Sequence, residues 1–512
     1  MIFFIPATSG PWNKQGERIR APLYSAAGGA ALAVAFLAPD WGPLAWFAFL
    51  PVFVLAPRAT DRRAAARIGF AMGITVNGIL GTWLIETIER FGGFPWPLAV
   101  FFYCLLVLYT GLPFAALGAL LRTAGPRAPL LLAPALWVAI EFLFPGLFPW
   151  RLAYSQRAYP LLIQSADLAG PGLLSFVMVW TTAALAQGEW RKLRAPLAAL
   201  LLLLAYGGWR MGVIEAEIAH APGLQIGVVQ GNLSLDEKHG VGRLTANLAR
   251  YRKLSSDLRP VPDLIVWPET VITWGIEQGR ALDPVRDPWP QAPAPLLFGA
   301  ISWRKGEDRM HWFNSVFLRG QDGSLQGRFD KIVLMPFGEF LPFADRFPWL
   351  RALSPQTANF DAGTNAAVFP LAGGARIGPA ICYEDMLHDP LGASAAGGAN
   401  ILISVANDAW YNQSAALLLH ETLGMWRAVE NRRFFLRATN TGLTSAIDPL
   451  GRRIFELPVG EAVAEVVSVR LLDVDTPFRH VGNSLDWALL LLALVLLGLT
   501  TNQNRRANSS TS

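Results

Sequence analysis

Residues 197–205 read Leu-Ala-Ala-Leu-Leu-Leu-Leu-Leu-Ala and lie within a segment, 195–214, in which Arg210 is the one charged side chain. A helix needs about 20 apolar residues to cross the hydrocarbon core of a bilayer. The segment is therefore predicted to span a membrane. Such a run also fits a core helix of a large soluble protein, but a second run at 489–499, LLLLALVLLGL, argues against that alternative.

The composition of the whole chain supports this prediction. Charged residues make up 16% of the 512 residues, against about 25% in typical soluble domains. A chain with 53% hydrophobic residues cannot cover its apolar atoms in water, so a purely soluble protein is nearly excluded. The same apolar content excludes disorder. Two cysteines, Cys104 and Cys382, exclude a disulfide scaffold and a multi-cysteine metal site.

Eight apolar segments are long enough to be candidate membrane spans. They lie at roughly 22–39, 43–57, 66–88, 96–121, 128–148, 160–187, 195–214 and 483–500. The sixth contains Gly170-Pro171-Gly172 and is expected to be broken or packed against other helices. Three carboxylates, Glu86, Glu141 and Asp167, lie in or near these spans, and we expect interhelical hydrogen bonds or proximity to the interface for them.

The basic residues are distributed unequally between the two sets of connecting loops. One set contains 14 Lys and Arg residues: Lys14, Arg18, Arg20, Arg58, Arg62, Arg63, Arg67, Arg122, Arg127, Arg191, Lys192, Arg194, Arg505 and Arg506. The alternate set before residue 221 contains three, Arg90, Arg151 and Arg157. Since cytoplasmic loops are rich in Lys and Arg, both termini are predicted to be cytoplasmic.

Three regions follow from these patterns. Residues 1–220 are predicted to form a membrane domain of about seven helices, and 481–512 a last helix with a cytoplasmic tail. Residues 221–480 have the composition of a soluble domain and are predicted to lie on the non-cytoplasmic side. The expected fold is thus an α-helical membrane bundle of about eight helices joined to one extracytoplasmic domain.

The region 221–480 alternates strand and helix patterns. Short apolar or alternating runs bounded by turn residues predict strands at 224–229, 264–267, 296–301, 314–318, 377–381 and 401–405. Asp322-Gly323 predicts a hairpin, and helical patterns follow at 241–257 and 416–437. Strands that alternate with helices, together with hairpins, predict an α/β sandwich with a mixed sheet.

Cys382 is the first candidate functional residue because it directly follows the apolar strand at 377–381 and precedes Tyr383, Glu384 and Asp385. A buried structural cysteine is the alternative interpretation. Cys104, within an apolar span, fits that structural role.

A reactive thiol needs a base or a nearby cation. Six histidines are available, of which His388 is closest in sequence, and none stands out. Glu269, which follows the strand end Trp267-Pro268, is better placed as a base, and Lys331 precedes an apolar stretch as a lone ammonium. Glu, Lys and Cys make up a base, an oxyanion stabiliser and a nucleophile, but spacing alone supports this weakly.

The strings around these residues resemble the Glu–Lys–Cys pattern of the carbon–nitrogen hydrolase (nitrilase) superfamily, and with membrane helices on both sides the chain resembles the bacterial apolipoprotein N-acyltransferases. The matching strings outside the membrane are Val229-Gln230-Gly231-Asn232, Trp267-Pro268-Glu269-Thr270, Lys331 with 336–342 (PFGEFLP), Ile381-Cys382-Tyr383-Glu384, Asn407-Asp408-Ala409-Trp410 and 437–442 (RATNTG). Those in the membrane half are 134–137 (PALW), Glu141, 148–150 (FPW) and 154–156 (YSQ).

The resemblance implies an αββα nitrilase-like sandwich with Glu269 as general base, Lys331 as oxyanion stabiliser and Cys382 as nucleophile. It also implies supporting roles for Glu339, Glu384 and Tyr383. For these three, simpler roles are an ion pair with Lys331, a turn cap and packing. No metal or organic cofactor is implied.

Three positions depart from the pattern of the family. Lys238-His239 stands where the family usually has Lys-Trp, Tyr411-Asn412 where it has Phe-Gly, and Phe144 where an Arg is common. These departures put loop and lid contacts in doubt, but not the triad.

The resemblance implies an acyl transfer at a bacterial inner membrane. A phospholipid would donate a fatty acyl chain to Cys382, and the α-amine of a diacylglyceryl-modified lipoprotein would accept it from the thioester. A membrane-anchored hydrolase of small amides or nitriles is the alternative, although it needs only one anchor. A transporter or receptor with an inactive sensor domain is a third, which an intact Glu269, Lys331 and Cys382 argue against. We expect a monomer and no nucleic-acid partner.

Overall fold

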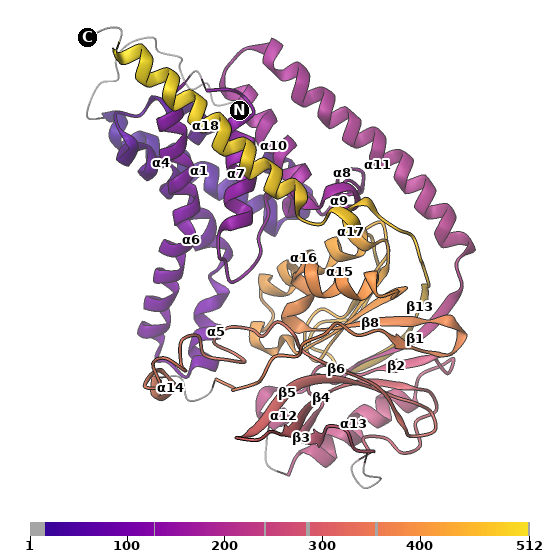
Figure 1. Cartoon of the computed structure of the whole chain (residues 1–512). Coiled ribbons are helices and arrows are strands. Elements are labelled where there is room, and N and C mark those ends of the chain that lie inside the picture. The colour runs from indigo at the N-terminus through magenta and orange to yellow at the C-terminus, as the bar shows by residue number, and fades with distance from the viewer. Residues whose placement is uncertain (1–15, 127, 240–241, 283–286, 354–356, 510–512) are drawn as a thin grey trace.

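The computed structural model describes residues 16–126, 128–239, 242–282, 287–353 and 357–509, so that Lys14 and Arg127 of the loop count lie outside it, as does residue 241 of the first predicted helix. A bundle of long helices forms one part of the molecule (Figure 1). Two stacked β-sheets with helices on their outer faces form the other part.

The helical part contains the long apolar segments. Its elements are α1 (Gly16–Leu37), η1 (Pro39–Leu44), α2 (Ala45–Ala48), α3 (Leu50–Leu55), η2 (Ala56–Arg58), α4 (Arg62–Leu80), α5 (Trp83–Gly92), α6 (Trp96–Ala124), α7 (Leu132–Leu143), η3 (Leu152–Gln156), α8 (Pro160–Ile163), α9 (Ala166–Ala169), α10 (Pro171–Ala186), η4 (Trp190–Leu193), α11 (Arg194–His220) and α18 (Ser484–Ser509). Small residues let these helices approach closely. A Cβ on Gly69 of α4 would lie 1.9 Å from the carbonyl oxygen of Phe114 in α6.

Fewer helices than predicted are long enough to cross a membrane. Among the described residues, five helical segments are long and apolar enough to cross a membrane. The pair α4–α5, bent by 60°, is a sixth if it counts as one span. The predicted span 128–148 is helical only over α7, because the chain turns extended at Phe144 before Pro145. The predicted span 160–187 is broken at Gly170, whose φ is +69°, as its Gly-Pro-Gly sequence indicates. The count of eight spans stays a prediction.

The first sheet has seven strands. They are β1 (Gly223–Gln230), β2 (Leu264–Val266), β3 (Ile272–Glu277), β4 (Leu296–Lys305), β5 (Met310–Arg319), β6 (Leu325–Asp330) and β13 (Val463–Arg470), in the order β13-β1-β2-β4-β5-β6 with β3 also paired to β4. β1, β2 and β4 are parallel, while β13, β5 and β6 are antiparallel to their neighbours. The sheet is therefore mixed, as predicted.

The second sheet has six strands in the order β12-β11-β10-β9-β8-β7. They are β7 (Phe369–Pro370), β8 (Arg376–Ile381), β9 (Ile401–Ala406), β10 (Phe434–Thr439), β11 (Ser445–Ile447) and β12 (Arg453–Glu456). Ile226 and Val228 of the first sheet share one apolar core with Ile377 and Ile403 of the second, so the sheets pack face to face. Helices α12 (Leu235–His239) and α13 (Leu244–Ser256) cover one outer face, and α15 (His388–Ala396) and α16 (Ala415–Asn431) cover the other (Figure 1).

One predicted element is wrong in part. The helix expected over 416–437 ends at Asn431, and residues 434–439 form strand β10. Arg432 stops the helix in the left-handed conformation at φ +50°. The next residues, Phe434 and Phe435, are buried, and β10 pairs with both β9 and β11, so tertiary packing overrides the helical pattern.

Buried ionic contacts join the helical part to the sheet part. Asp167 of α9, fully buried, accepts hydrogen bonds from Tyr206 (2.6 Å) and Arg210 (2.6 Å) of α11 and from Arg432 (2.8 Å) after α16. The expected interhelical bond is thus present for Asp167. Glu141 instead accepts from Trp137 of its own helix (2.7 Å) and from the backbone of residue 152 (2.7 Å).

Candidate active site

Cys382 lies where β8 ends and the short 3-10 helix η6 (Cys382–Met386) begins. Its φ is +51°, a left-handed conformation that is strained for a residue with a side chain. The side chain is 9% exposed. Burial, and then the negative charge of Glu269, raise the pKa of the Cys382 thiol well above its ordinary value. The thiol is therefore not a preformed thiolate, and a base must take its proton during attack.

Glu269 follows β2, where Pro268 ends the strand. The turn lies directly against Gly299 of β4: a Cβ there would be 2.6 Å from the Cα of Glu269 and 2.5 Å from the backbone nitrogen of Thr270. The carboxylate is 7% exposed, and its Oε1 accepts a hydrogen bond from Asn314 Nδ2 (2.7 Å). No described residue bonds to its Oε2, so one oxygen is free to accept a proton.

Lys331 directly follows β6, and its side chain is 1% exposed. Nζ lies 2.6 Å from Oε2 of Glu339. Burial lowers the pKa of Lys331, but the charges of Glu339, Cys382 and Glu269 outweigh burial and raise it above its ordinary value. Lys331 is therefore a permanent cation, as an oxyanion stabiliser requires.

The sequence analysis did not identify Asn314 as a site residue. Its Nδ2 donates to Glu269 and, over 2.8 Å, to Oε1 of Glu339, so one amide connects Glu269 to the Lys331–Glu339 pair. The available signal was Asn314-Ser315, a polar pair inside the predicted strand, where a buried amide needs partners.

Tyr383 and Glu384, the two residues after Cys382, connect the turn at Cys382 to neighbouring segments of the chain. Glu384, fully buried, accepts from the backbone nitrogens of Ile332 (2.7 Å), Val333 (3.1 Å) and Ile381 (2.9 Å). It thereby ties the Lys331 loop to the strand that carries Cys382. The hydroxyl of Tyr383 donates to the carbonyl oxygen of Leu147 in the helical part (2.6 Å). Glu384 therefore caps this turn, and Tyr383 contacts the helical part. Together their bonds connect the Lys331 loop, the Cys382 turn and the helical part.

A fully buried ionic cluster was also not identified from the sequence. Arg437 of β10 donates to both carboxylate oxygens of Asp408 (2.8 and 2.9 Å), to Asp385 (3.1 Å) and to Nδ1 of His420 (2.6 Å). Nε2 of His420 donates to Asp385 over 2.7 Å. Asp385 is three residues from Cys382 and belongs to η6, so the cluster holds η6 in place. The histidine that bonds to a residue of this turn is His420. His388, which is closest to Cys382 in sequence, bonds to Glu430 instead.

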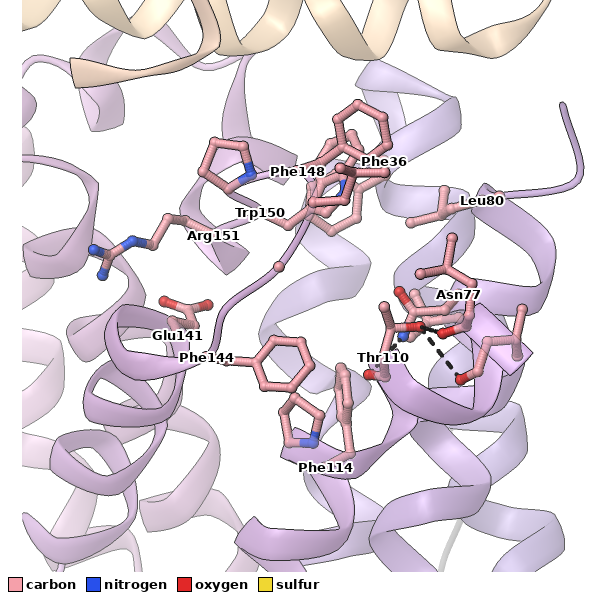
Figure 2. Close-up of a pocket in the computed structure, with 18 of the residues that line it drawn as sticks. Phe36, Asn77, Leu80, Thr110, Phe114, Glu141, Phe144, Phe148, Trp150 and Arg151 are labelled. Carbon is pink, nitrogen blue, oxygen red and sulfur yellow. Dashed lines mark hydrogen bonds between the residues drawn. The ribbon is translucent and has the colours of Figure 1, made fainter. Parts of the chain in front are cut away.

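An apolar cavity of about 330 Å³ lies in the helical part, beside the segment that contacts Tyr383. Helices α1, α4, α5, α6 and α7 and the residues 144–152 line it. In Figure 2, Glu141 and Arg151 lie on one side, and Asn77 and Thr110 lie on the opposite side. Leu147 is part of the wall and accepts the Tyr383 hydrogen bond. The cavity wall therefore reaches Tyr383, the residue next to Cys382.

Comparison with known proteins decides the family. The family described as "Apolipoprotein N-acyltransferase N-terminal domain" matches residues 28–184, and the family described as "Carbon-nitrogen hydrolase" matches residues 225–473. The chain is 31% identical over 499 residues to the apolipoprotein N-acyltransferase of Geobacter metallireducens, covering 93% of this chain and 94% of the relative. It is 33% identical over 500 residues to that of Azotobacter vinelandii, covering 93% and 94%.

The chain belongs to the apolipoprotein N-acyltransferase family. Among solved structures, Nit3 of Saccharomyces cerevisiae, a member of the nitrilase superfamily, is similar at 16% identity with a TM-score of 0.38, covering 48% of this chain and 90% of Nit3. In the described residues, no group of three or more His, Cys, Asp or Glu side chains is placed to hold a metal ion.

Two departures from the acyltransferase pattern lie at the cavity, where one lines it and the other packs against a lining residue. Tyr411 packs edge-on against Trp83 of α5, with ring centroids 5.1 Å apart, and Trp83 lines the cavity. Phe144 lines the same cavity and packs against Tyr109. The side chain of His239 lies outside the described residues. Both departures therefore place aromatic rings at or next to the cavity wall.

Proposed function

We propose that this protein transfers a fatty acyl chain from a membrane phospholipid to the α-amino group of the N-terminal diacylglyceryl-cysteine of apolipoproteins, through a thioester on Cys382. The observation that carries the proposal is that Asn314 joins Glu269 to the Lys331–Glu339 pair, while the charges of Glu269 and Lys331 both act on the buried Cys382 thiol. A nitrilase-like domain joined to apolar helices fits a reaction whose two substrates both lie in a membrane.

The first half-reaction forms the thioester. Glu269 accepts the proton of Cys382 as the sulfur attacks the ester carbonyl of the phospholipid. A carbon–sulfur bond forms, and the negative charge on the carbonyl oxygen is held by Lys331. The ester carbon–oxygen bond then breaks, and the lysophospholipid leaves with the proton from Glu269.

The second half-reaction forms the amide. The α-amine of the lipoprotein attacks the thioester carbonyl, so a carbon–nitrogen bond forms and the carbon–sulfur bond breaks. Glu269 takes one proton from the amine and returns it to the sulfur of Cys382. The enzyme is regenerated without a cofactor, by a ping-pong mechanism.

The cavity beside Tyr383 supports a site for the acyl chain. It is lined mainly by apolar side chains of five helices, and its wall contacts the residue next to Cys382. In the proposed reaction an acyl chain occupies this cavity while its ester carbonyl reaches the thiol of Cys382. Glu339, Glu384 and Tyr383 then act by positioning Lys331 and Cys382.

The unequal distribution of Lys and Arg supports a topology for the family member. We propose a membrane domain over 1–220, a catalytic domain over 221–480 and a last membrane helix over 481–512. In this arrangement eight spans cross the bacterial inner membrane, both termini are cytoplasmic and the catalytic domain is periplasmic. The enzyme acts as a monomer.

Mass spectrometry of the purified protein tests the chemistry. After incubation with phospholipid alone, we expect one acyl group on the peptide that contains Cys382, and its loss on addition of a diacylglyceryl lipopeptide. Cys382→Ala abolishes the adduct, whereas the matched control Cys104→Ala, on α6, keeps it. An unacylated Cys382, or an enzyme that hydrolyses small amides and ignores phospholipid, contradicts the proposal and favours the hydrolase alternative.

A further inference from the structure

Lys238 is a second buried lysine at the active site. It belongs to the short helix α12, it is 4% exposed, and its Nζ donates to the carbonyl oxygen of Glu269 over 2.8 Å. The contact is to the main chain of the residue proposed as general base. Lys238 therefore lies directly behind the turn that presents Glu269.

The surrounding chain fixes this lysine in place. Ser234 and Glu237 bond reciprocally at the start of α12, with the Ser234 nitrogen 2.9 Å from Glu237 and the Glu237 nitrogen 3.2 Å from the Ser234 hydroxyl. Asn247 of α13 donates to the carbonyl oxygen of Glu237 over 2.8 Å. These bonds fix the short helix that carries Lys238. A lysine that only covered the surface would not need a fixed helix.

The charges around the two lysines differ. Lys331 is neutralised by Glu339 at 2.6 Å. Within the described part of the chain, no carboxylate forms an ion pair with Lys238, and the bond to Glu269 is to its carbonyl oxygen. A buried ammonium without a carboxylate partner is costly. It also exerts its full field on the neighbouring groups, because nothing close to it cancels the charge.

We propose that Lys238 is a positioning residue for the reaction, whose ammonium fixes the main chain of Glu269 and adds the positive charge that the Glu269–Cys382 pair needs during thiol attack. The inference rests on the roles proposed above for Glu269 and Cys382. Lys331 then acts on the carbonyl oxygen of the substrate, while Lys238 acts on the base and the thiol through its contact with the main chain of Glu269.

The titratable groups that face Lys238 are Glu269 after β2 and Cys382 after β8, while Glu237 on its own helix bonds to Ser234 and Arg250. Burial lowers the pKa of Lys238 to about 8, against the charge of Glu269, which raises it. Lys331 remains charged in this range because its pKa is raised. The positive charge at position 238 is therefore lost as the pH rises through about 8.

Single-turnover release of lysophospholipid, measured with the full-length protein and without acceptor, tests the proposal between about pH 6 and about pH 9.5. In the wild type the rate falls above about pH 8. Lys238→Arg keeps its charge, so we expect its rate to hold at high pH. Lys238→Met is expected to be slower by about tenfold at neutral pH and to lack the alkaline decline. Lys253→Met, which removes an exposed lysine of α13, is the control.

Lys238→Met at the wild-type rate, or Lys238→Arg with the wild-type alkaline decline, overturns the proposal. If Lys238→Met does not fold, the pH dependence of the rate of Lys238→Arg decides. A merely structural lysine would leave the decline of the rate at alkaline pH unchanged in that variant. Alkylation of Cys382 by iodoacetamide, followed on its peptide with Cys104 as internal reference, needs no acyl transfer. We expect Lys238→Met to slow it by about tenfold. Cys382 of the wild type could be alkylated faster than Cys382 of Lys238→Met and yet form no thioester with phospholipid. That result refutes the proposed function and leaves the assignment of Lys238 intact.

Discussion

The Nδ2 atom of Asn314 donates a hydrogen bond to Oε1 of Glu269 over 2.7 Å. The same atom donates to Glu339 over 2.8 Å, so a neutral amide separates two carboxylates that would otherwise repel each other. It also leaves the second oxygen of Glu269, to which no described residue donates a hydrogen bond, free to accept a proton. Asn314 therefore sets the direction of the proposed base.

Replacing this amide by a carboxylate tests its role. Asn314→Asp removes the N–H donor and adds a third negative charge beside Glu269 and Glu339, so we expect thioester formation to fall by about 100-fold or more. Asn365→Asp adds the same charge at an exposed position and is the matched control. Wild-type acylation by a folded Asn314→Asp protein would show that the amide does not orient the base.

Sequence patterns located the strands better than the site. The six predicted strands all exist, because short apolar runs between turn residues have few alternatives. Strand β10 was mistaken for the end of a helix, because its burial depends on β9 and β11 and not on its own periodicity. Likewise Asn314 and Lys238 acquire their significance from contacts with Glu269 across the fold. No local pattern contains such contacts.

Gly299 is predicted to be essential for the position of Glu269. In Gly299→Ala, the new Cβ would meet three backbone atoms of residues 268–270 at 2.5–2.6 Å, and backbone cannot rotate away as a side chain can. We expect a destabilisation of about 1–3 kcal/mol and a larger loss of acylation than the stability change explains. Thermal unfolding and single-turnover acylation measure the two effects. Gly212→Ala, where nothing lies within 4 Å of a new Cβ, is the control and should change neither.

The hydroxyl of Tyr383 is predicted to couple the cavity wall to the nucleophile. Tyr383→Phe keeps the ring and removes the bond to Leu147, which costs about 1 kcal/mol of stability. We expect acylation to slow by about tenfold, because Cys382 and the cavity are then less well aligned. Tyr159→Phe removes a comparable bond, to the carbonyl oxygen of Asp40, away from the site. Equal rates in the two variants would refute the coupling.

Glu384 is predicted to make stability depend on pH. Burial raises its pKa from 4.5 to about 7 in the folded protein, against Lys331 and three N–H groups that lower it. Between these values the folded state binds more protons than the unfolded state, so stability falls as the pH rises from about 4.5 to about 7, by roughly 3 kcal/mol. Glu384→Gln does not titrate.

The melting temperatures of wild type and Glu384→Gln, compared at several pH values across this window, measure the effect. We expect the wild type to lose stability relative to Glu384→Gln as the pH rises, whereas Glu465→Gln, at an exposed position, runs parallel to the wild type. A constant difference between wild type and Glu384→Gln would mean that this carboxyl does not change its proton occupancy on folding.

The cluster around Arg437 is predicted to contribute more to stability than any exposed ion pair of the catalytic domain. Arg437→Leu leaves the carboxylates of Asp385 and Asp408 buried without their cation, and removing one partner of a buried pair costs about 3–5 kcal/mol. Arg376→Leu breaks the exposed contact to Asp473 and should cost no more than about 1 kcal/mol. Since Asp385 lies on the same turn as Cys382, the thiol of Arg437→Leu should also become more accessible to iodoacetamide. Equal unfolding midpoints for the two variants would show that the cluster does not hold this turn.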